Sequence, residues 1–171
     1  MKQVKKAKIL TPQDLTQILA YIEQTPFAPR NRALVLITVM AGLCAKETAA
    51  LLVSDVMDEQ GQIKDIIHLR PEQSKNQQAH SVVISDQLKL ELQRYFATYH
   101  PNTPTAPLFF TQKNAIRGFS QNTLTQHLFW LYKRSGIDAS SESGKNTYRH
   151  AQSSKSRSKS PQNDVQENQE K

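Results

Sequence analysis

A sharp turn at Gly42-Leu43 brings chemically active side chains into one short segment. Cys44, the single cysteine of the chain, is followed closely by Lys46 and Glu47. A reactive or redox-active cysteine needs a lowered pKa and access to solvent, whereas most free cysteines pack as small apolar residues. Two positions along a helix rotate a side chain by about 200°, so Lys46 would point away from Cys44. We therefore interpret Cys44 as a half-buried packing residue.

The other residues with catalytic potential show no recognised catalytic spacing. The five histidines are scattered without metal-ligand spacing. The chain contains neither a phosphate-binding loop nor a Gly-x-Ser-x-Gly motif. Asp55, Asp58 and Glu59 are close in sequence, but carboxylates at such a position usually belong to a turn. The sequence therefore predicts no metal site and no cofactor.

The positive charge is concentrated at the two ends of the chain. The net charge is +7, yet residues 9–144 contain as many acidic as basic residues. A neutral body gives little electrostatic reason of its own to bind nucleic acid. Phosphate binding by exposed lysines would be tolerant of sequence and would weaken with salt. The lysines that could contribute are Lys2, Lys5, Lys6, Lys8, Lys75 and Lys145.

The sequence favours a cytoplasmic protein with no membrane segment. The longest apolar-rich run, residues 33–45, has 13 residues, whereas a spanning helix needs about 20. A single cysteine excludes an intramolecular disulfide. The N-terminal lysines lead into Thr11-Pro12 and not into the apolar core of a signal peptide.

Helical periodicity dominates the chain. The segment from Arg30 to Ala41 is apolar nearly all round and is predicted to be a central buried helix ending at Gly42. Apolar spacing and end signals predict the other helices. These lie at about residues 11–24, 45–53, 86–98 and 120–134.

The remaining segments predict a small sheet, a linker and a disordered end. Residues 63–69 and 81–84 are predicted to be antiparallel strands around a polar loop. Three prolines make residues 100–107 a linker, followed by a short extended segment at 108–110. Because Val165 is the one apolar residue after Ala151, residues 150–171 are predicted to be disordered.

Five segments, in order along the chain, resemble landmarks of the tyrosine recombinases (the phage integrase family). The first box matches at Gly42, Leu43, Glu47, Leu51, Asp55 and Val56. The others are Leu10-Thr11-Pro12-Gln13-Asp14, Ser74-Lys75 with residues 82–85, Pro107-Leu108-Phe109, and the second box at residues 136–148. The resemblance implies a mainly α fold with a small antiparallel β-sheet, cut off before the last helices of that catalytic domain.

The resemblance also implies a reaction, and most of the residues that perform it are replaced. The family holds the scissile phosphate with two arginines, moves protons with a histidine and a lysine, and attacks with a tyrosine. Cys44 and Lys145 stand at the arginine positions and Glu142 at the histidine position, whereas Lys75 matches the lysine. A thiol cannot hold phosphate as a guanidinium does, and a lysine lacks the planar fork.

The nucleophile and the DNA contacts complete what the resemblance implies. The family's tyrosine lies well beyond the second box, and here no tyrosine follows Tyr148. The predicted DNA-binding residues are Lys46, Lys75, His80, Lys145 and Arg149.

We therefore expect an integrase-like protein of mobile-element origin, related to DNA integration and site-specific recombination, that does not cleave DNA and binds it weakly. The alternative is a non-catalytic DNA-binding or regulatory module that pairs with an intact recombinase. A homo-oligomer and a site completed by a partner subunit are further hypotheses. The expected organisation is a basic segment at 1–9, an incomplete catalytic domain at 10–149 and a disordered tail at 150–171.

Overall fold

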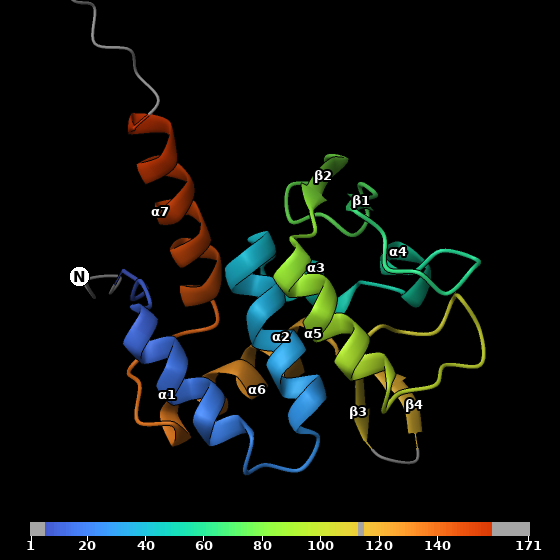
Figure 1. Cartoon of the computed structure of the whole chain (residues 1–171), viewed down its shortest axis with the longest axis horizontal. Helices are drawn as coiled ribbons and strands as arrows, with labels where there is room; N and C mark the ends of the chain where they lie inside the picture. The colour runs from blue at the N-terminus through green and yellow to red at the C-terminus, as the bar shows by residue number, and fades with distance from the viewer. Residues whose placement is uncertain (1–5, 113–114, 159–171) are drawn as a thin grey trace, which may run out of the picture.

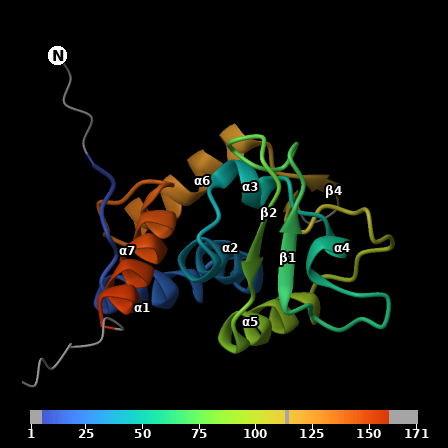
Figure 2. The ribbon, with the colours of Figure 1, turned by 90° about the horizontal axis from the view of Figure 1, so that it is seen from above.

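Helices and two small hairpins make up the computed structural model, which describes residues 6–112 and 115–158. The helices are α1 (Pro12–Ile22), α2 (Ala28–Ala41), α3 (Ala45–Ala49), α4 (Val53–Val56), α5 (Asp86–Phe96), α6 (Gln121–Arg134) and α7 (Ser143–Arg157). The strands are β1 (Ile66–Leu69), β2 (His80–Val83), β3 (Phe110–Gln112) and β4 (Ala115–Gly118). Helices α1 and α7 lie at one end of the molecule and both hairpins at the other (Figures 1 and 2).

Helix α2 lies at the centre of the molecule, as its apolar sequence predicts. Residues 33–37 are each no more than 1% exposed, so the helix is buried on all sides. It contacts α1, α3, α5 and α7. A helix that is apolar all round needs partners on every face, and this chain supplies them. No helix in the described residues is both long and apolar enough to cross a bilayer.

The helix predicted at 45–53 is two short helices, and that part of the prediction was wrong. Residues 50–52 leave the helix to pair with the proline-rich segment. The Leu108 amide donates to the Leu51 carbonyl at 2.9 Å, and the Val53 amide donates to Ala106 at 3.0 Å. These bonds replace helical ones, and they join the first box to a segment more than 50 residues away.

The two hairpins are separate two-stranded sheets. Strands β1 and β2 pair antiparallel, as the sequence predicts, and the register places Ile66 opposite Val83. The second hairpin, β3 with β4, extends the predicted segment at 108–110 and adds a strand that the sequence pattern did not indicate.

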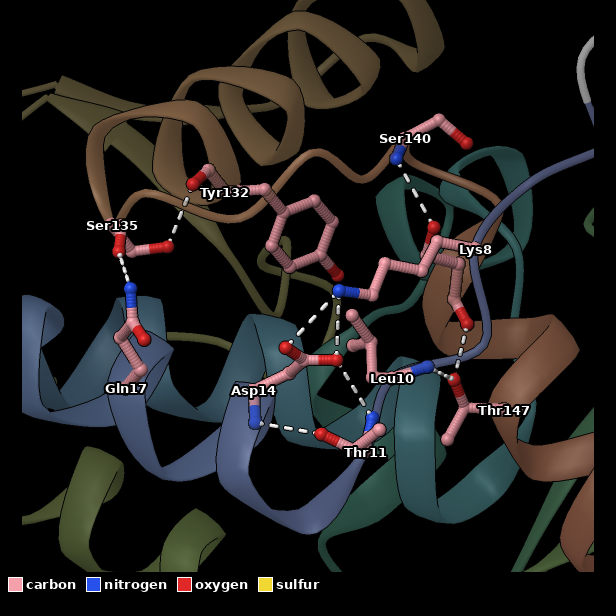
Figure 3. Close-up of polar contacts among 10 residues, drawn as sticks. Lys8, Leu10, Thr11, Asp14, Gln17, Tyr132, Ser135, Ser140 and Thr147 are labelled. Carbon is pink, nitrogen blue, oxygen red and sulfur yellow. Dashed lines mark hydrogen bonds and ion pairs between the residues drawn. The ribbon is translucent and has the colours of Figure 1, made fainter.

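The N-terminal segment connects α1 to the later helices (Figure 3). The Leu10 amide donates to the Thr147 hydroxyl on α7 at 2.8 Å, and the Gln17 side chain donates to the Ser135 carbonyl at 2.6 Å. The start of α1 therefore helps to hold α7 and the end of α6 in place.

Thr11 caps α1, and its removal is expected to cost about 1 kcal/mol of folding stability. Its hydroxyl accepts from the Asp14 amide at 3.1 Å, while Asp14 accepts from the Thr11 amide at 2.9 Å. Urea unfolding of Thr11→Ala measures this loss. Thr16→Ala, an exposed threonine inside the same helix, is the control; an equal loss there would contradict the capping role.

Helix α7 corrects the predicted tail. Its first turn packs closely on α2, because Gly144 has no side chain where a Cβ would lie 2.7 Å from Thr38 Cβ. The helix then continues through His150 to Arg157. The helix therefore crosses the predicted boundary after residue 149 and includes residues 150–157, which the composition predicted to be disordered. The rest of the predicted tail, residues 159–171, lies outside the described residues.

Candidate functional site

The corner after α2 places Cys44 in the interior. Gly42 ends α2 in the left-handed conformation, with φ 70°. Cys44 is 2% exposed and precedes the first turn of α3. Burial raises the pKa of its thiol, so the group is protonated and neutral at physiological pH. The position supplies no positive charge to a phosphate.

Glu47 is the buried centre of the site. Its side chain is 3% exposed. One carboxylate oxygen accepts from the Cys44 amide at 2.9 Å and lies 3.6 Å from the Lys145 ammonium. The other accepts from the Lys75 amide at 3.4 Å and lies 3.8 Å from His80 Nε2. Burial opposes ionisation, but the Cys44 amide and Lys145 outweigh it and lower the pKa of Glu47.

The loop between β1 and β2 carries Lys75 and is anchored to the body of the protein by the buried side chain of Gln73. The Gln73 amide group donates to the Ala50 carbonyl at 3.0 Å and to Asp55 at 2.8 Å. Asp55 also accepts from Arg70 at 3.0 Å. Gln73 and Ser74 are each 2% exposed, so this polar loop has a buried base that holds Lys75 beside the first box.

The second box brings two further residues to the same place. Lys145, on the first turn of α7, pairs with Glu47 as described above. Glu142 directly precedes α7, and its carboxylate lies 3.9 Å from the Lys75 ammonium. Residues from α3, the β1–β2 loop and the start of α7 therefore meet, although about 100 residues separate them in sequence.

The charges of this cluster cancel. Lys75 and Lys145 face Glu142 and Glu47, so each lysine has a carboxylate partner. His80 is a further ionisable side chain beside Glu47. Within the described residues, no three His, Cys, Asp or Glu side chains are grouped to hold a metal ion.

An open hollow of about 340 Å³ lies beside the cluster. Its lining includes Gly42, His80, Lys145, Tyr148 and Arg149. Arg149 forms no ion pair with another described residue. Lys46 is not among the residues that line the hollow, and its ammonium donates to the Ser74 carbonyl at 3.0 Å. Of the predicted DNA-contact residues, the structure thus brings His80, Lys145 and Arg149 to the hollow and uses Lys46 to support the loop.

Tyr148 is the tyrosine on the hollow, and its ring lies against Gly42. Tyr95 and Tyr132 are fully buried, and burial raises the pKa of both phenols, to about 12 for Tyr132. The Tyr99 hydroxyl donates to the Pro107 carbonyl at 2.9 Å. These three tyrosines pack the core and are poorly placed to attack a phosphate.

Two residues that shape the site were not predicted as site residues. Glu47 matched the first-box pattern, and that match was the signal that could have identified it. The sequence did not indicate a role for Gln73, because a glutamine in a polar loop is usually exposed to solvent. Its contacts with Ala50 and Asp55 depend on the tertiary fold.

Comparison with known proteins gives a family and a fold. No curated protein matches the sequence. The model of the phage integrase family matches residues 8–168. The structure is similar to the crystal structure of XerA recombinase, with a TM-score of 0.65 and 19% identity over 84% of this chain and 50% of that one.

Two DNA complexes are also similar. XerH site-specific recombinase bound to difH substrate matches with a TM-score of 0.61 and 18% identity, over 86% of this chain and 43% of that one. The Tn1549 transposon integrase in complex with circular intermediate DNA matches with a TM-score of 0.57 and 15% identity. The match covers 85% of this chain and 53% of that one. The chain thus spans about half the length of these proteins and shares the fold of their catalytic domain, mainly α with small antiparallel sheets. Because the family model matches most of its length, the chain belongs to the phage integrase family, the tyrosine recombinases.

Proposed function

We propose that this protein is a DNA-binding member of the recombinase family that does not break DNA strands. It would contact the phosphate backbone weakly at the hollow beside Glu47, in the cytoplasm. The same contact would let it occupy recombination-type DNA beside an intact recombinase, as a non-catalytic module. The observation that carries the proposal is the cancellation of charge in the cluster.

Strand cleavage needs cationic side chains that bind the phosphate more strongly in the transition state, where additional negative charge develops on its oxygens. Here the two lysines are each engaged by a carboxylate. Moving Lys145 to a phosphate would leave Glu47 buried beside His80 without its ammonium partner, and an unpaired buried charge is costly. Glu142 would in addition repel the phosphate. The cluster therefore favours its own internal pairs over a scissile phosphate.

Weak binding is still expected, because Arg149 lines the hollow without a carboxylate partner in the described residues. An arginine offers paired donors to phosphate oxygens. One such contact gives affinity that depends on salt and little on sequence. This distinguishes the proposed role from sequence-specific recognition.

A supercoiled plasmid tests the absence of strand breakage without knowledge of a target site. We expect the protein to retard the plasmid at low salt, with neither relaxed nor nicked DNA after incubation. An active tyrosine recombinase with its own substrate is the positive control. Relaxation that increases with protein concentration would overturn the proposal.

Restoring one arginine is expected to change nothing in this assay. Cys44→Arg places a guanidinium in a site where Glu142 and Lys145 still replace the family residues. We expect no strand breakage, and a loss of folding stability, because position 44 is buried and a buried arginine must find partners. Breakage by Cys44→Arg would show that the thiol is the one missing element, contrary to our account.

A further inference from the structure

The outer half of α7 projects from the body of the protein (Figure 1). Residues Arg149–Ser158, called here the α7 arm, are all exposed. The first two turns of α7 pack on α2, at Gly144 against Thr38 and at Tyr148 against Gly42. The arm continues that helix beyond the last of these contacts.

Within the part of the chain that the structure describes, no hydrogen bond or ion pair joins the arm to a residue outside α7. Its serine hydroxyls donate back to the carbonyls of their own helix, Ser153 to Arg149 at 3.0 Å and Ser154 to His150 at 3.1 Å. Serine is a weak helix former, and such back-bonding slightly destabilises a helix. The arm is therefore a helix that the packed turns nucleate and that opens easily in solution.

The charge of the arm has one sign. No acidic residue occurs in α7, and Arg149, Lys155 and Arg157 have no ion pair with another described residue. Successive helical positions are 100° apart, so Lys155 and Arg157 lie on different sides of the helix. A partner that neutralises all three cations must surround the arm or present charge on more than one side.

The side chains of the arm select the class of partner. Ala151 is its only apolar residue, whereas a membrane surface or a protein groove requires an apolar face or anchors. Cations interspersed with hydroxyl and amide groups are the side chains that contact nucleic-acid phosphates. The two phosphate walls of a duplex groove also supply charge on more than one side.

We propose that the α7 arm binds the phosphate backbone of duplex DNA and that binding stabilises its helix. This inference rests on the proposed function, because Arg149 belongs both to the arm and to the lining of the hollow. The arm would thus extend the weak contact at the hollow and would supply much of the affinity.

The first test measures binding of a 30-base-pair duplex by fluorescence anisotropy at several salt concentrations. Lys155→Gln/Arg157→Gln removes two phosphate contacts, so the negative slope of log K against log salt should become shallower by about 1.8. The matched control is Lys89→Gln/Arg94→Gln, which removes two cations from α5, where they pair with Asp65 and Glu23. The slope of log K against log salt for this control should stay close to that of the natural protein.

The second test separates a helical arm from a merely charged one. Ser154→Pro keeps every cation but removes a helical hydrogen bond, and we expect about tenfold weaker binding. Ser154→Ala, at the same position, should bind at least as tightly as the natural protein. Hydrogen exchange of amides in residues 150–158 should be fast in the free protein and slower with DNA.

Several outcomes would overturn the inference. Equal slopes for the arm variant and the natural protein would show that the arm makes no phosphate contact, and would leave the proposed function standing. If Ser154→Pro binds DNA as tightly as the natural protein does, DNA binding is not coupled to formation of the helix. Competition by polyglutamate at equal charge would favour an acidic protein partner over DNA. No binding by the natural protein, even at low salt, would contradict the proposed function as well.

Discussion

Gly42→Ala is expected to lower the free energy of unfolding by about 2–5 kcal/mol, a large part of the stability of a small domain. A non-glycine residue in the left-handed region costs about 1–2 kcal/mol. The new methyl group would also lie 2.7 Å from Tyr148 Cε1, and overpacking of this kind costs about 1–3 kcal/mol. Chemical denaturation monitored by circular dichroism measures the sum.

Gly61→Ala separates these two contributions. Gly61 has φ +77°, and a Cβ there meets nothing within 4 Å, so only the backbone cost of about 1–2 kcal/mol should be seen. The double variant Gly42→Ala/Tyr148→Ala should regain part of the loss relative to Tyr148→Ala alone. An equal loss of stability in Gly42→Ala and Gly61→Ala would show that Tyr148 of α7 does not pack closely against Gly42.

Glu47→Gln is the second large effect, with an expected loss of about 2–3 kcal/mol at neutral pH. The variant keeps the size of the side chain and one acceptor oxygen, but removes the charge that pairs with Lys145 and strengthens the hydrogen bond from the Cys44 amide. The loss stays below that of a fully enclosed ion pair because the Lys145 side chain is 14% exposed. Glu59→Gln, an exposed carboxylate, is the control and should be nearly neutral.

The Glu47 effect should depend on pH with a definite sign. The pKa of Glu47 is lowered from the ordinary value of 4.5 in the folded protein. Its stabilising contribution is therefore complete above about pH 4.5 and disappears as the pH falls through the folded-state pKa. The difference in stability between the natural protein and Glu47→Gln should shrink below pH 4.5. A difference that grows with acidification would contradict an ionised Glu47.

The fold was largely predictable from local pattern. The central helix and the helix at 120–134 follow from apolar spacing, because their apolar positions are buried. The β1–β2 hairpin follows from two β-branched runs on either side of a polar loop, although β2 remains mostly exposed. The break at residues 50–52 was not predictable in this way. It results from pairing with Ala106 and Leu108, which are distant in sequence, and no local signal records that pairing.

The sequence indicated which segments meet near Cys44, but not the central position of Glu47 or the pairing of the charged side chains. The family resemblance placed Cys44, Lys75, Glu142 and Lys145 at one site, and the structure brings them together. The pairing of Lys145 with Glu47 and of Lys75 with Glu142 depends on tertiary geometry. The α7 arm was missed because its composition resembles that of a disordered segment, and its helix begins in turns that are packed on α2.

The most direct test of the account is a search for a covalent protein–DNA adduct. The protein is incubated with a pool of nicked duplexes whose sequence around the nick is randomised, and the products are separated on a denaturing gel. We predict no adduct at protein concentrations that bind the DNA, while an active tyrosine recombinase forms one on its own nicked substrate. An adduct mapped to Tyr148 by mass spectrometry, and lost in Tyr148→Phe, would show that the charge-neutral cluster still supports cleavage and would contradict the account.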